Sequence, residues 1–435
     1  MQRRLTIAQI AATVVSLAVL SGCGQTGMPA LVNGQAAGGF AALADLVGID
    51  AQITKALVET NMNGTLVKKL PSPGKTKPVT FLTYKALDNN LGVTLPQHIN
   101  TLEKAGSNTN INALAFTDDI GPKNTFRYYI RADKDMDTIT SPYEPANKSG
   151  DMNTGSGETL RRAIKWAFTE YPSKFRWLDV NNHGGGYYGI AQDDQKDDII
   201  RLPELASALK GAGQKLDVVS FDACLMATAE VAYELRDTAK VMVASEDSSY
   251  ALGMNVDKTL QAMSAKPTID ADDLSRDLVL RAERKGKIKA LFTISAIDLT
   301  KAGNVTQAVD QLAVALTAAL KTEKPAIMMS LKAVKAFYVA GPDKSDFNHR
   351  DLNEVVDQLR QRVSSPAVKA ACQAVKTSLF NKGGAILLSR AANEQGGVAR
   401  GLSIYLPTDG QVDPIYKDTA FAKATKWDEF LAQLK

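Results

Sequence analysis

The sequence predicts an α/β protein with a mostly parallel central sheet flanked by helices. From Val79 onward, short apolar runs rich in β-branched residues alternate with amphipathic helical segments. Strands that are separated by single helices are typical of a parallel, helix-covered sheet. The chain has 435 residues, which is enough for one large domain or two ordinary ones.

Strand and helix patterns follow one another in a regular order. Residues 157–172 predict a helix that Pro172 ends, with an apolar side formed by Leu160, Ile164, Trp166 and Phe168. The predicted strands are 79–84, 112–117, 125–130, 176–182, 215–221 and 239–245. Beyond residue 265 we expect helices over 272–286, 302–321, 325–338 and 351–378, with strands at 291–298, 384–390 and 401–407. This helix-rich C-terminal region is either a second domain or an elaboration of the same sheet.

The N-terminus has the pattern of an export signal. "MQRRLTIAQIAATVVSLAVLSGC" has a basic start, an apolar run too short for a comfortable membrane span, and small residues before Cys23. The tail "LSGC" resembles a bacterial lipobox, which implies lipidation of Cys23 and a lipid-anchored protein of the bacterial cell envelope. Gly24 after the cysteine favours the outer membrane if the cell is Gram-negative. An ordinary signal peptide with an incidental cysteine is the alternative.

These patterns divide the chain into four regions. We expect a lipoprotein signal peptide over 1–22, a tether over 23–75, a catalytic domain over 76–265, and the C-terminal region over 266–435. The formal net charge of +4 falls to +2 when residues 1–22, with two arginines and no acid, are removed. A near-neutral balance excludes the basic footprint of a nucleic-acid binder, and three cysteines are too few for a disulfide framework.

A histidine and a cysteine follow neighbouring predicted strands. His183 stands in "NNHGGG", at the carboxyl end of strand 176–182, and Cys224 follows strand 215–221. One helix separates the two strands, so their carboxyl ends share a sheet edge, where α/β proteins bind ligands. A nearby imidazole and a helix N-terminus both lower a thiol pKa. We expect the helix in "LMATAEVAYELR" to begin directly behind Cys224, and His183 to lie in an exposed loop.

Gly184 has a separate predicted role beside His183 and Cys224. A glycine lets a substrate carbonyl approach the backbone, and the N–H groups of Gly184 and Cys224 are candidates for an oxyanion hole. Taken alone, a cysteine before an apolar helix is usually a core residue, and a histidine before glycines usually marks a turn. Spacing alone leaves both interpretations open.

The motifs resemble the clostripain family of cysteine peptidases, which have a caspase-like fold. "NNHGGG", "FDACLMATAEVAYEL" and "VMVASED" occur in the family's order, and the likeness extends over roughly residues 78–407. The resemblance implies a caspase-like sandwich in which His183 is the general base and Cys224 the nucleophile. It also implies protein or peptide substrates and no required cofactor. We expect a monomer.

The resemblance also assigns Asp222 to the pocket that receives Arg or Lys before the cleaved bond. A buried carboxylate that pairs with a long cation is a sound specificity device, although Asp222 is also placed to cap the next helix. The segment "DSSYALGMNVD" departs from the family, since Leu252 and Met254 stand near an expected acid and tryptophan. This departure weakens the expected preference for basic residues. It is also the only feature in favour of the alternative, a catalytically silent binding protein, which the presence of both His183 and Cys224 argues against.

An acidic loop, "QDDQKDDII", follows the glycine turn. Many relatives cleave themselves between the histidine and the cysteine, and Lys196 is the candidate position for such a cut. Some relatives need calcium, and carboxylate oxygens are the ligands that calcium prefers. The calcium candidates here are Asp193, Asp194, Asp197 and Asp198. A solvated acidic loop explains the same residues. His98 and His349 are expected to be structural or surface residues, Cys372 is expected in the core, and no zinc spacing is present.

Overall fold

The structure is a computed structural model that describes residues 64–72, 74–135, 138–249, 254–282, 292–337, 347–392 and 399–435. The predicted signal peptide, Cys23 and most of the predicted tether lie outside these ranges. Among the described residues, no helix combines the length and the apolar character needed to span a bilayer.

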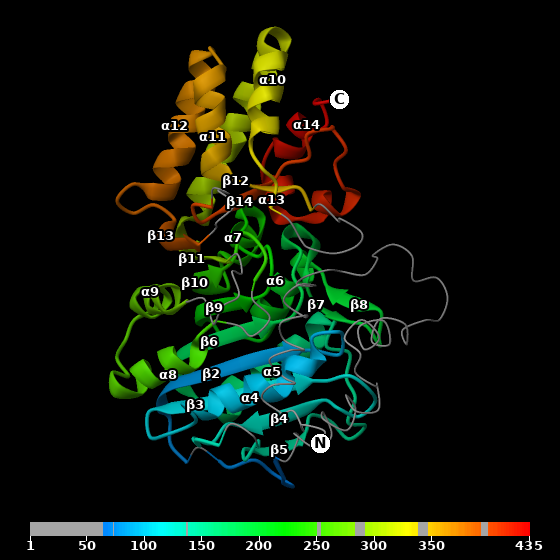
Figure 1. The fold of residues 1–435 in the computed structure, drawn as a ribbon, viewed down its shortest axis with the longest axis vertical. Helices are drawn as coiled ribbons and strands as arrows, with labels where there is room; N and C mark the ends of the chain where they lie inside the picture. Colours follow the sequence, from blue (N-terminus) through cyan, green and yellow to red (C-terminus); the bar gives the residue numbers. More distant parts are fainter. Residues whose placement is uncertain are drawn as a thin grey trace, which may run out of the picture.

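A ten-stranded sheet forms the centre of the molecule, in the order β1-β5-β4-β3-β2-β6-β9-β10-β11-β13 (Figure 1). Its strands are β1 (Thr65–Leu66), β2 (Lys77–Ala86), β3 (Ile111–Asp118), β4 (Phe126–Tyr129), β5 (Pro142–Pro145), β6 (Ser173–Asn181), β9 (Leu216–Asp222), β10 (Ala239–Ala244), β11 (Phe292–Asp298) and β13 (Ile386–Ala392). The five consecutive strands β3, β2, β6, β9 and β10 are parallel to one another. The flanking strands β4, β11 and β13 pair antiparallel, so the predicted mostly parallel sheet is confirmed.

Helices cover both faces of the sheet, as the burial of its central strands requires. One face packs against α5 (Gly157–Glu170), α6 (Leu202–Gly211), α7 (Ala229–Leu235) and the C-terminal helices. The other face packs against α4 (Leu95–Glu103), α8 (Val256–Ala265) and α9 (Ala271–Arg281). In α5, Leu160, Ala163, Ile164 and Ala167 are buried at helical spacing, and the Ser156 side chain caps the N-terminus by accepting from Glu158 N–H.

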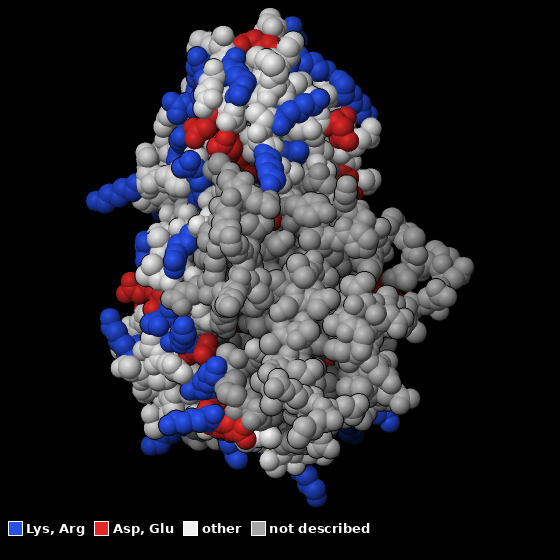
Figure 2. All heavy atoms as spheres, in the orientation of Figure 1, with Lys and Arg blue, Asp and Glu red and all other residues white. Residues whose placement is uncertain are grey.

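The C-terminal region extends the same sheet, since β11 and β13 are its last two strands. Its helices are α10 (Ala302–Ala333), α11 (Leu352–Arg362), α12 (Pro366–Phe380), α13 (Ala420–Ala424) and α14 (Trp427–Leu431). The expected single helix over 351–378 is wrong, because Ser365 and Pro366 start a new helix with its own cap. Conversely, α10 continues through Pro325 with a kink at Glu323. Figure 2 shows lysines and arginines over this helical end, interspersed with acidic side chains.

Two small sheets lie beside the central one. The hairpin of β7 (Ile190–Asp193) and β8 (Asp198–Ile200) follows the glycine-rich loop. The other pair consists of β12 (His349–Asp351) and β14 (Ser403–Tyr405), so the predicted strand at 401–407 pairs outside the central sheet. Ser403 also forms a bridge with Thr228, just before α7. The C-terminal region therefore contacts the segment that carries Cys224.

Candidate active site

The sheet brings His183 and Cys224 to equivalent positions on neighbouring strands. β6 and β9 are parallel neighbours, and their register pairs Asn181 with Asp222. His183 and Cys224 each follow two residues beyond this pair. The loops that carry them touch, because a Cβ added to Gly184 would lie 2.4 Å from the Cys224 carbonyl oxygen. The two residues therefore leave the same sheet edge side by side, as the sequence predicts.

The His183 ring is held by an amide from a third strand end. Its Nε2 lies 2.6 Å from Oδ1 of Asn90, four residues beyond the end of β2. Because an amide oxygen only accepts hydrogen bonds, this contact places the proton of the neutral ring on Nε2. The other ring nitrogen, Nδ1, then carries the lone pair. That nitrogen is buried, and none of the described residues hydrogen-bonds to it. The ring is thus oriented so that Nδ1 is the unprotonated nitrogen that accepts a proton.

The expectation that His183 lies in an exposed loop is wrong. Its exposed fraction is only 4%, because the chain turns back over it after the glycines. Ala191 N–H donates to the His183 carbonyl at 3.2 Å, and Gly184 bridges to Ile190. Burial lowers the pKa of His183 to about 4, since desolvation disfavours the charged imidazolium. The ring is therefore neutral at physiological pH, which is the form that a general base needs.

Cys224 is buried against an apolar patch, with 1% of its surface exposed. Leu225 and Phe337 pack in the same cluster, and Sγ accepts a hydrogen bond from Ser249 N–H at 3.1 Å. Hydrogen bonds to sulfur favour the thiolate over the thiol.

The helix after Cys224 begins later than predicted. α7 begins at Ala229, with Thr228 as its N-cap, so its N-terminus is not directly behind the thiol. Leu225 adopts a positive φ of 61°, and Leu225 N–H and Ala227 N–H donate to the carbonyls of Asp247 and Ser245. These hydrogen bonds hold residues 225–227 against the chain that follows β10. The expected helix-terminus contribution to the thiol pKa is therefore wrong, and so is the alternative that Asp222 caps the helix.

Asp222 lies in a buried charged cluster under the sheet edge. A small cavity is lined by Asp222, Asp179, Lys85 and His98. Lys85 Nζ lies 3.3 Å from Asn181 Oδ1 and 3.3 Å from His98 Nδ1. Desolvation lowers the pKa of Lys85, and the nearby carboxylates of Asp179 and Asp222 oppose that shift. His98 therefore belongs to this cluster, although the sequence indicated only a structural role.

Asp179 is held in this cluster by hydrogen bonds from two hydroxyl groups. Its two oxygens accept hydrogen bonds from Thr83 Oγ1 at 2.9 Å and from Ser220 Oγ at 2.7 Å. Of the two acids, Asp179 also has the larger electrostatic effect on Lys85. Asp179 thus has the main electrostatic influence on Lys85, and Asp222 adds a second negative charge nearby. The segment whose sequence departs from the family, 248–256, is described only at Ser248, Ser249 and from Met254 onward.

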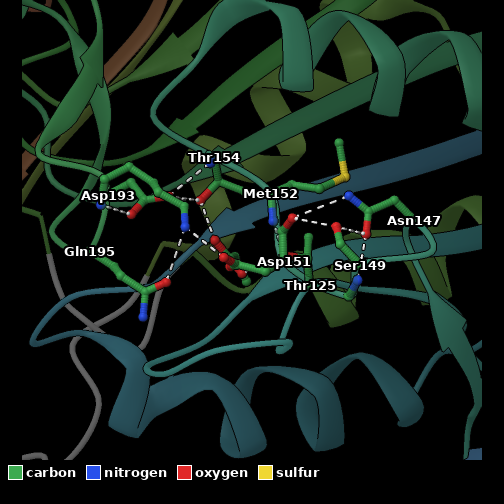
Figure 3. A network of polar contacts seen from close by, with 11 residues as sticks. Thr125, Asn147, Ser149, Asp151, Met152, Thr154, Asp193 and Gln195 are labelled. Atoms are coloured by element: carbon green, nitrogen blue, oxygen red, sulfur yellow. Dashed lines mark hydrogen bonds and ion pairs between the residues drawn. The ribbon is translucent and has the colours of Figure 1, made fainter.

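The acidic loop forms the turn between β7 and β8. Lys196 is exposed there, and its Nζ pairs with Asp151 at 2.6 Å (Figure 3). Of the four calcium candidates, only Asp193 lies in a group of acids that could hold a cation, and its neighbours are Asp88 and Asp118. The side chains of Asp194 and Asp198 accept hydrogen bonds from Gln192 and Asn153 instead. Asp197 is exposed, at a φ of 50°.

The remaining candidates have core positions. His349 is fully buried and its ring lies 5.6 Å from that of Tyr187, and Cys372 is buried in α12. Two residues of the site were missed by sequence reasoning, Asn90 and Lys85. A signal was present, because "DNN" at 88–90 follows a buried strand, and polar residues at that point of a parallel strand face the ligand edge. Lys85 lies within the strand and gave no such signal.

Comparison with known proteins identifies the family of this chain. A model of the clostripain family matches residues 83–433. The chain belongs to the clostripain family. It is 26% identical over 311 residues to clostripain of Hathewaya histolytica, a match that covers 56% of this chain and 57% of that protein. The match thus spans a little over half the length of this relative.

Solved structures of the family share the fold. An inactive zymogen C11 protease from Parabacteroides distasonis superimposes with a TM-score of 0.59 at 21% identity, covering 82% of this chain and 99% of that one. A secreted C11 cysteine protease from Bacteroides thetaiotaomicron, in complex with an irreversible peptide inhibitor, gives 0.59 at 18% identity, covering 81% and 100%. The predicted caspase-like sandwich is therefore confirmed.

Proposed function

We propose that this clostripain-family chain is a cysteine endopeptidase that uses Cys224 as nucleophile and His183 as general base. The observation that carries the proposal is the shared edge: register places both residues at matched positions beyond β6 and β9, and Gly184 abuts the Cys224 backbone. Residues that must exchange a proton need this proximity. Family membership, with relatives that are peptidases, supports the same activity.

Each proton has a defined place in the proposed reaction. Asn90 holds the Nε2–H of His183, so Nδ1 takes the thiol proton as Sγ attacks the carbonyl carbon of the scissile bond. The same nitrogen then gives the proton to the departing amine, which leaves an acyl-enzyme thioester. A water molecule, deprotonated by Nδ1, hydrolyses the thioester and regenerates the thiol. Because burial keeps His183 neutral, the imidazolium forms only during turnover.

The backbone of Gly184 is suited to stabilise the oxyanion. The bridge between Gly184 and Ile190 uses the N–H groups of Gly185 and Ala191, which donate to Gly189 and His183. The Gly184 amide takes no part in that bridge, and Gly184 packs closely against the Cys224 carbonyl. We assign the N–H groups of Gly184 and Cys224 to the oxyanion hole, where one donor typically contributes about 100-fold or more to the rate.

The charged cluster favours a basic residue before the cleaved bond. Asp179, Asp222 and Asp257 line the same small cavity as Lys85, so the acidic side chains described there outnumber the lysine. A substrate Arg or Lys that reaches Asp222 would balance the charge, and charge-assisted pairs of this kind are strong where water is excluded. We therefore propose cleavage after Arg or Lys, with Asp222 as the acceptor.

A peptide assay tests the activity directly. Purified protein in reducing buffer is given peptides that differ only in the residue before the scissile bond: Arg, Lys, Leu or Asp. We expect turnover of the Arg and Lys peptides, abolished by Cys224→Ala and by a thiol alkylator. The buried Cys372 offers a matched control, because Cys372→Ala removes a thiol far from the edge and should leave turnover intact. A folded, reduced protein that cleaves no peptide of a broad library would instead support the silent binding protein.

We further propose that the protein is anchored to the cell envelope by a lipid on Cys23, and that calcium is not essential for the chemistry itself. Support for the anchor is the lipobox-like "LSGC" alone. Mass spectrometry of the mature protein from its native membrane tests this, because an acylated N-terminal cysteine has a defined mass. The same spectrum reports on a cut at Lys196, whose exposure at the β7–β8 turn suits self-cleavage. An unmodified Cys23 would overturn the anchor.

A further inference from the structure

A second cavity, separate from the one at Asp222, is bordered by the C-terminal region. It has a volume of about 610 Å³ and is lined by residues of α11, α12, β13 and the segment before β14. Among the described residues that line it, two are cations, Lys376 and Arg400, and none is an acid. The cavity is therefore suited to an anionic group.

The strand order places this cavity at the edge of the sheet that carries Cys224. β13 pairs antiparallel with β11, and β11 pairs antiparallel with β10, so β13 runs in the same direction as β9 and β10. Ser389 and Ala391, in the C-terminal half of β13, line the cavity. Ala399 connects the two sites, because it lines the cavity and also packs against the apolar cluster that contains Cys224.

The backbone at Arg400 is fixed by hydrogen bonds to two buried carboxylates. Arg400 N–H donates to Asp351 Oδ2 at 2.7 Å, at the start of α11, and Gly401 N–H donates to Glu246 Oε2 at 2.6 Å, just after β10. Gly401 has a φ of 121°, which favours glycine. The Arg400 side chain itself is exposed. Only that side chain is left to order when a ligand binds, which lowers the cost of binding.

The guanidinium of Arg400 is an uncompensated charge beside the cavity. It forms no ion pair with a carboxylate in the part of the chain that the structure describes. Lys376 Nζ, in contrast, pairs with Asp357 Oδ1 at 2.6 Å, and Asn353 Nδ2 donates to the other oxygen of Asp357 at 3.2 Å. Asp357 thus orients Lys376. Because an ammonium group has three N–H donors, Lys376 still has donors for a second acceptor.

We propose that this cavity is a substrate subsite that receives an acidic side chain of the peptide through Arg400 and Lys376. The inference rests on the proposed peptidase activity and adds a class of substrate, namely chains with Glu or Asp at a distance from the cleaved bond. A guanidinium donates two parallel hydrogen bonds to a carboxylate, and such charge-assisted pairs are strong. Phe380, which lines the cavity and is 43% exposed, offers an apolar wall to the methylene groups of a glutamate.

Strand spacing predicts how far the acidic residue lies from the cleaved bond. Cys224 follows β9, and β13 is the third strand beyond β9 in the sheet. Neighbouring strands lie about 4.8 Å apart, so the end of β13 is about 14 Å from the end of β9. An extended peptide covers about 3.3 Å per residue. The acidic side chain is therefore expected roughly four residues from the scissile bond.

Paired peptides test the subsite. Every peptide has Arg before the scissile bond, and one position at a time, over about five residues on each side, holds Glu in one member of the pair and Gln in the other. At a position roughly four residues from the bond we expect kcat/KM to be about fivefold or more higher for Glu. Arg400→Gln should bring this ratio close to one. Lys369→Gln is the matched control, because Lys369 is an exposed lysine of α12 that does not line the cavity, and it should keep the ratio.

A binding measurement separates failure of the subsite from failure of the peptidase. The same pairs are titrated into the Cys224→Ala protein, followed by fluorescence anisotropy, and the Glu peptide should bind about fivefold or more tightly than its Gln partner. Lys376→Gln provides a second test if Arg400→Gln does not fold. The proposal is overturned if no position shows a Glu preference, or if Lys369→Gln removes the preference while Arg400→Gln keeps it. If no peptide is cleaved at all, the proposed peptidase activity fails, and the ratio of dissociation constants still decides whether the subsite exists.

Discussion

Replacement of Asn90 tests the proposed role of the histidine most directly. In Asn90→Ala the Nε2–H of His183 loses its acceptor at 2.6 Å in a ring that is 4% exposed. A buried donor without a partner costs about 1–3 kcal/mol, and about 1.4 kcal/mol corresponds to a tenfold change in rate. If this cost falls on the catalytic orientation of the ring, kcat/KM drops roughly 5- to 150-fold. The proton can also move to Nδ1, which removes the base.

Asn90→Asp should change the pH dependence of the rate, and the direction of that change is defined. A carboxylate next to Nε2–H stabilises the imidazolium, so it raises the pKa of His183 above the value of about 4 that burial imposes. An opposite charge at this distance shifts a pKa by about 1–3 units. Because the base must be unprotonated, the acid limb of kcat/KM moves to higher pH. With a pKa near 6, only about a tenth of the enzyme is active at pH 5, against about nine-tenths of the wild type.

The assay is the pH profile of kcat/KM between pH 4 and pH 8 with the best peptide, in reducing buffer. Asn89→Ala is a useful comparison, because Asn89 contacts the Asn182 side chain and the Gln192 carbonyl rather than the His183 ring. Wild-type rates and an unmoved acid limb in both Asn90 variants would refute the assignment of Nδ1 as the base. A shift of the acid limb to lower pH in Asn90→Asp would refute it as well.

Three further predictions concern other parts of the site. Gly184→Ala places a Cβ 2.4 Å from the Cys224 carbonyl oxygen. We therefore expect the free energy of unfolding to fall by about 1–3 kcal/mol and most of the peptidase activity to be lost. Urea denaturation measures the first and peptide kinetics the second, and a variant unchanged in both contradicts the close approach. Asp222→Asn should lower kcat/KM for Arg and Lys peptides about tenfold or more. Iodoacetamide should still alkylate Cys224 at the wild-type rate. Equal losses of kcat/KM for Arg and Leu peptides would argue against a specificity role for Asp222. His349 is buried, and its pKa is lowered to about 3 by desolvation and by Arg350. The unfolded chain therefore binds its proton first, and the folded state loses stability as pH falls below about 6.5. Between pH 7.5 and pH 4.5, His349→Phe should lose about 2.7 kcal/mol less than the wild type in urea unfolding, and parallel losses would rule this out.

Sequence reasoning identified the strands and the two residues at their ends, because hydrophobic periodicity and strand order depend on local pattern. It could not place the start of the helix after Cys224. The positive φ of Leu225 and the bonds of Leu225 and Ala227 to the β10 end are tertiary contacts, and they override the helical pattern of "LMATAEV". The burial of His183 was missed for a similar reason, since the cover comes from the returning β7 strand.

The sequence also did not predict which charged residues from distant segments lie close together. Lys85 looks like an exposed strand residue, yet it is buried between Asp179 and Asp222 because β2, β6 and β9 are adjacent. The acidic loop suggested four calcium ligands by proximity in sequence, whereas the structure groups Asp193 with Asp118 at the end of β3 and with Asp88, which follows β2. Residues close in sequence on a turn point apart, so an acidic run says little about which oxygens meet.

The order of the central strands explains why an amide, an imidazole and a thiol occur together. β2, β6 and β9 are consecutive and parallel, so the segments after them emerge in a row at one edge. Asn90 comes from the first, His183 from the second and Cys224 from the third. The ring in the middle contacts the amide through Nε2, which leaves Nδ1 for the other neighbour. If this row is the working arrangement, the direction of proton transfer is fixed by strand order, and moving the proton to Nδ1 should stop catalysis without disturbing the fold.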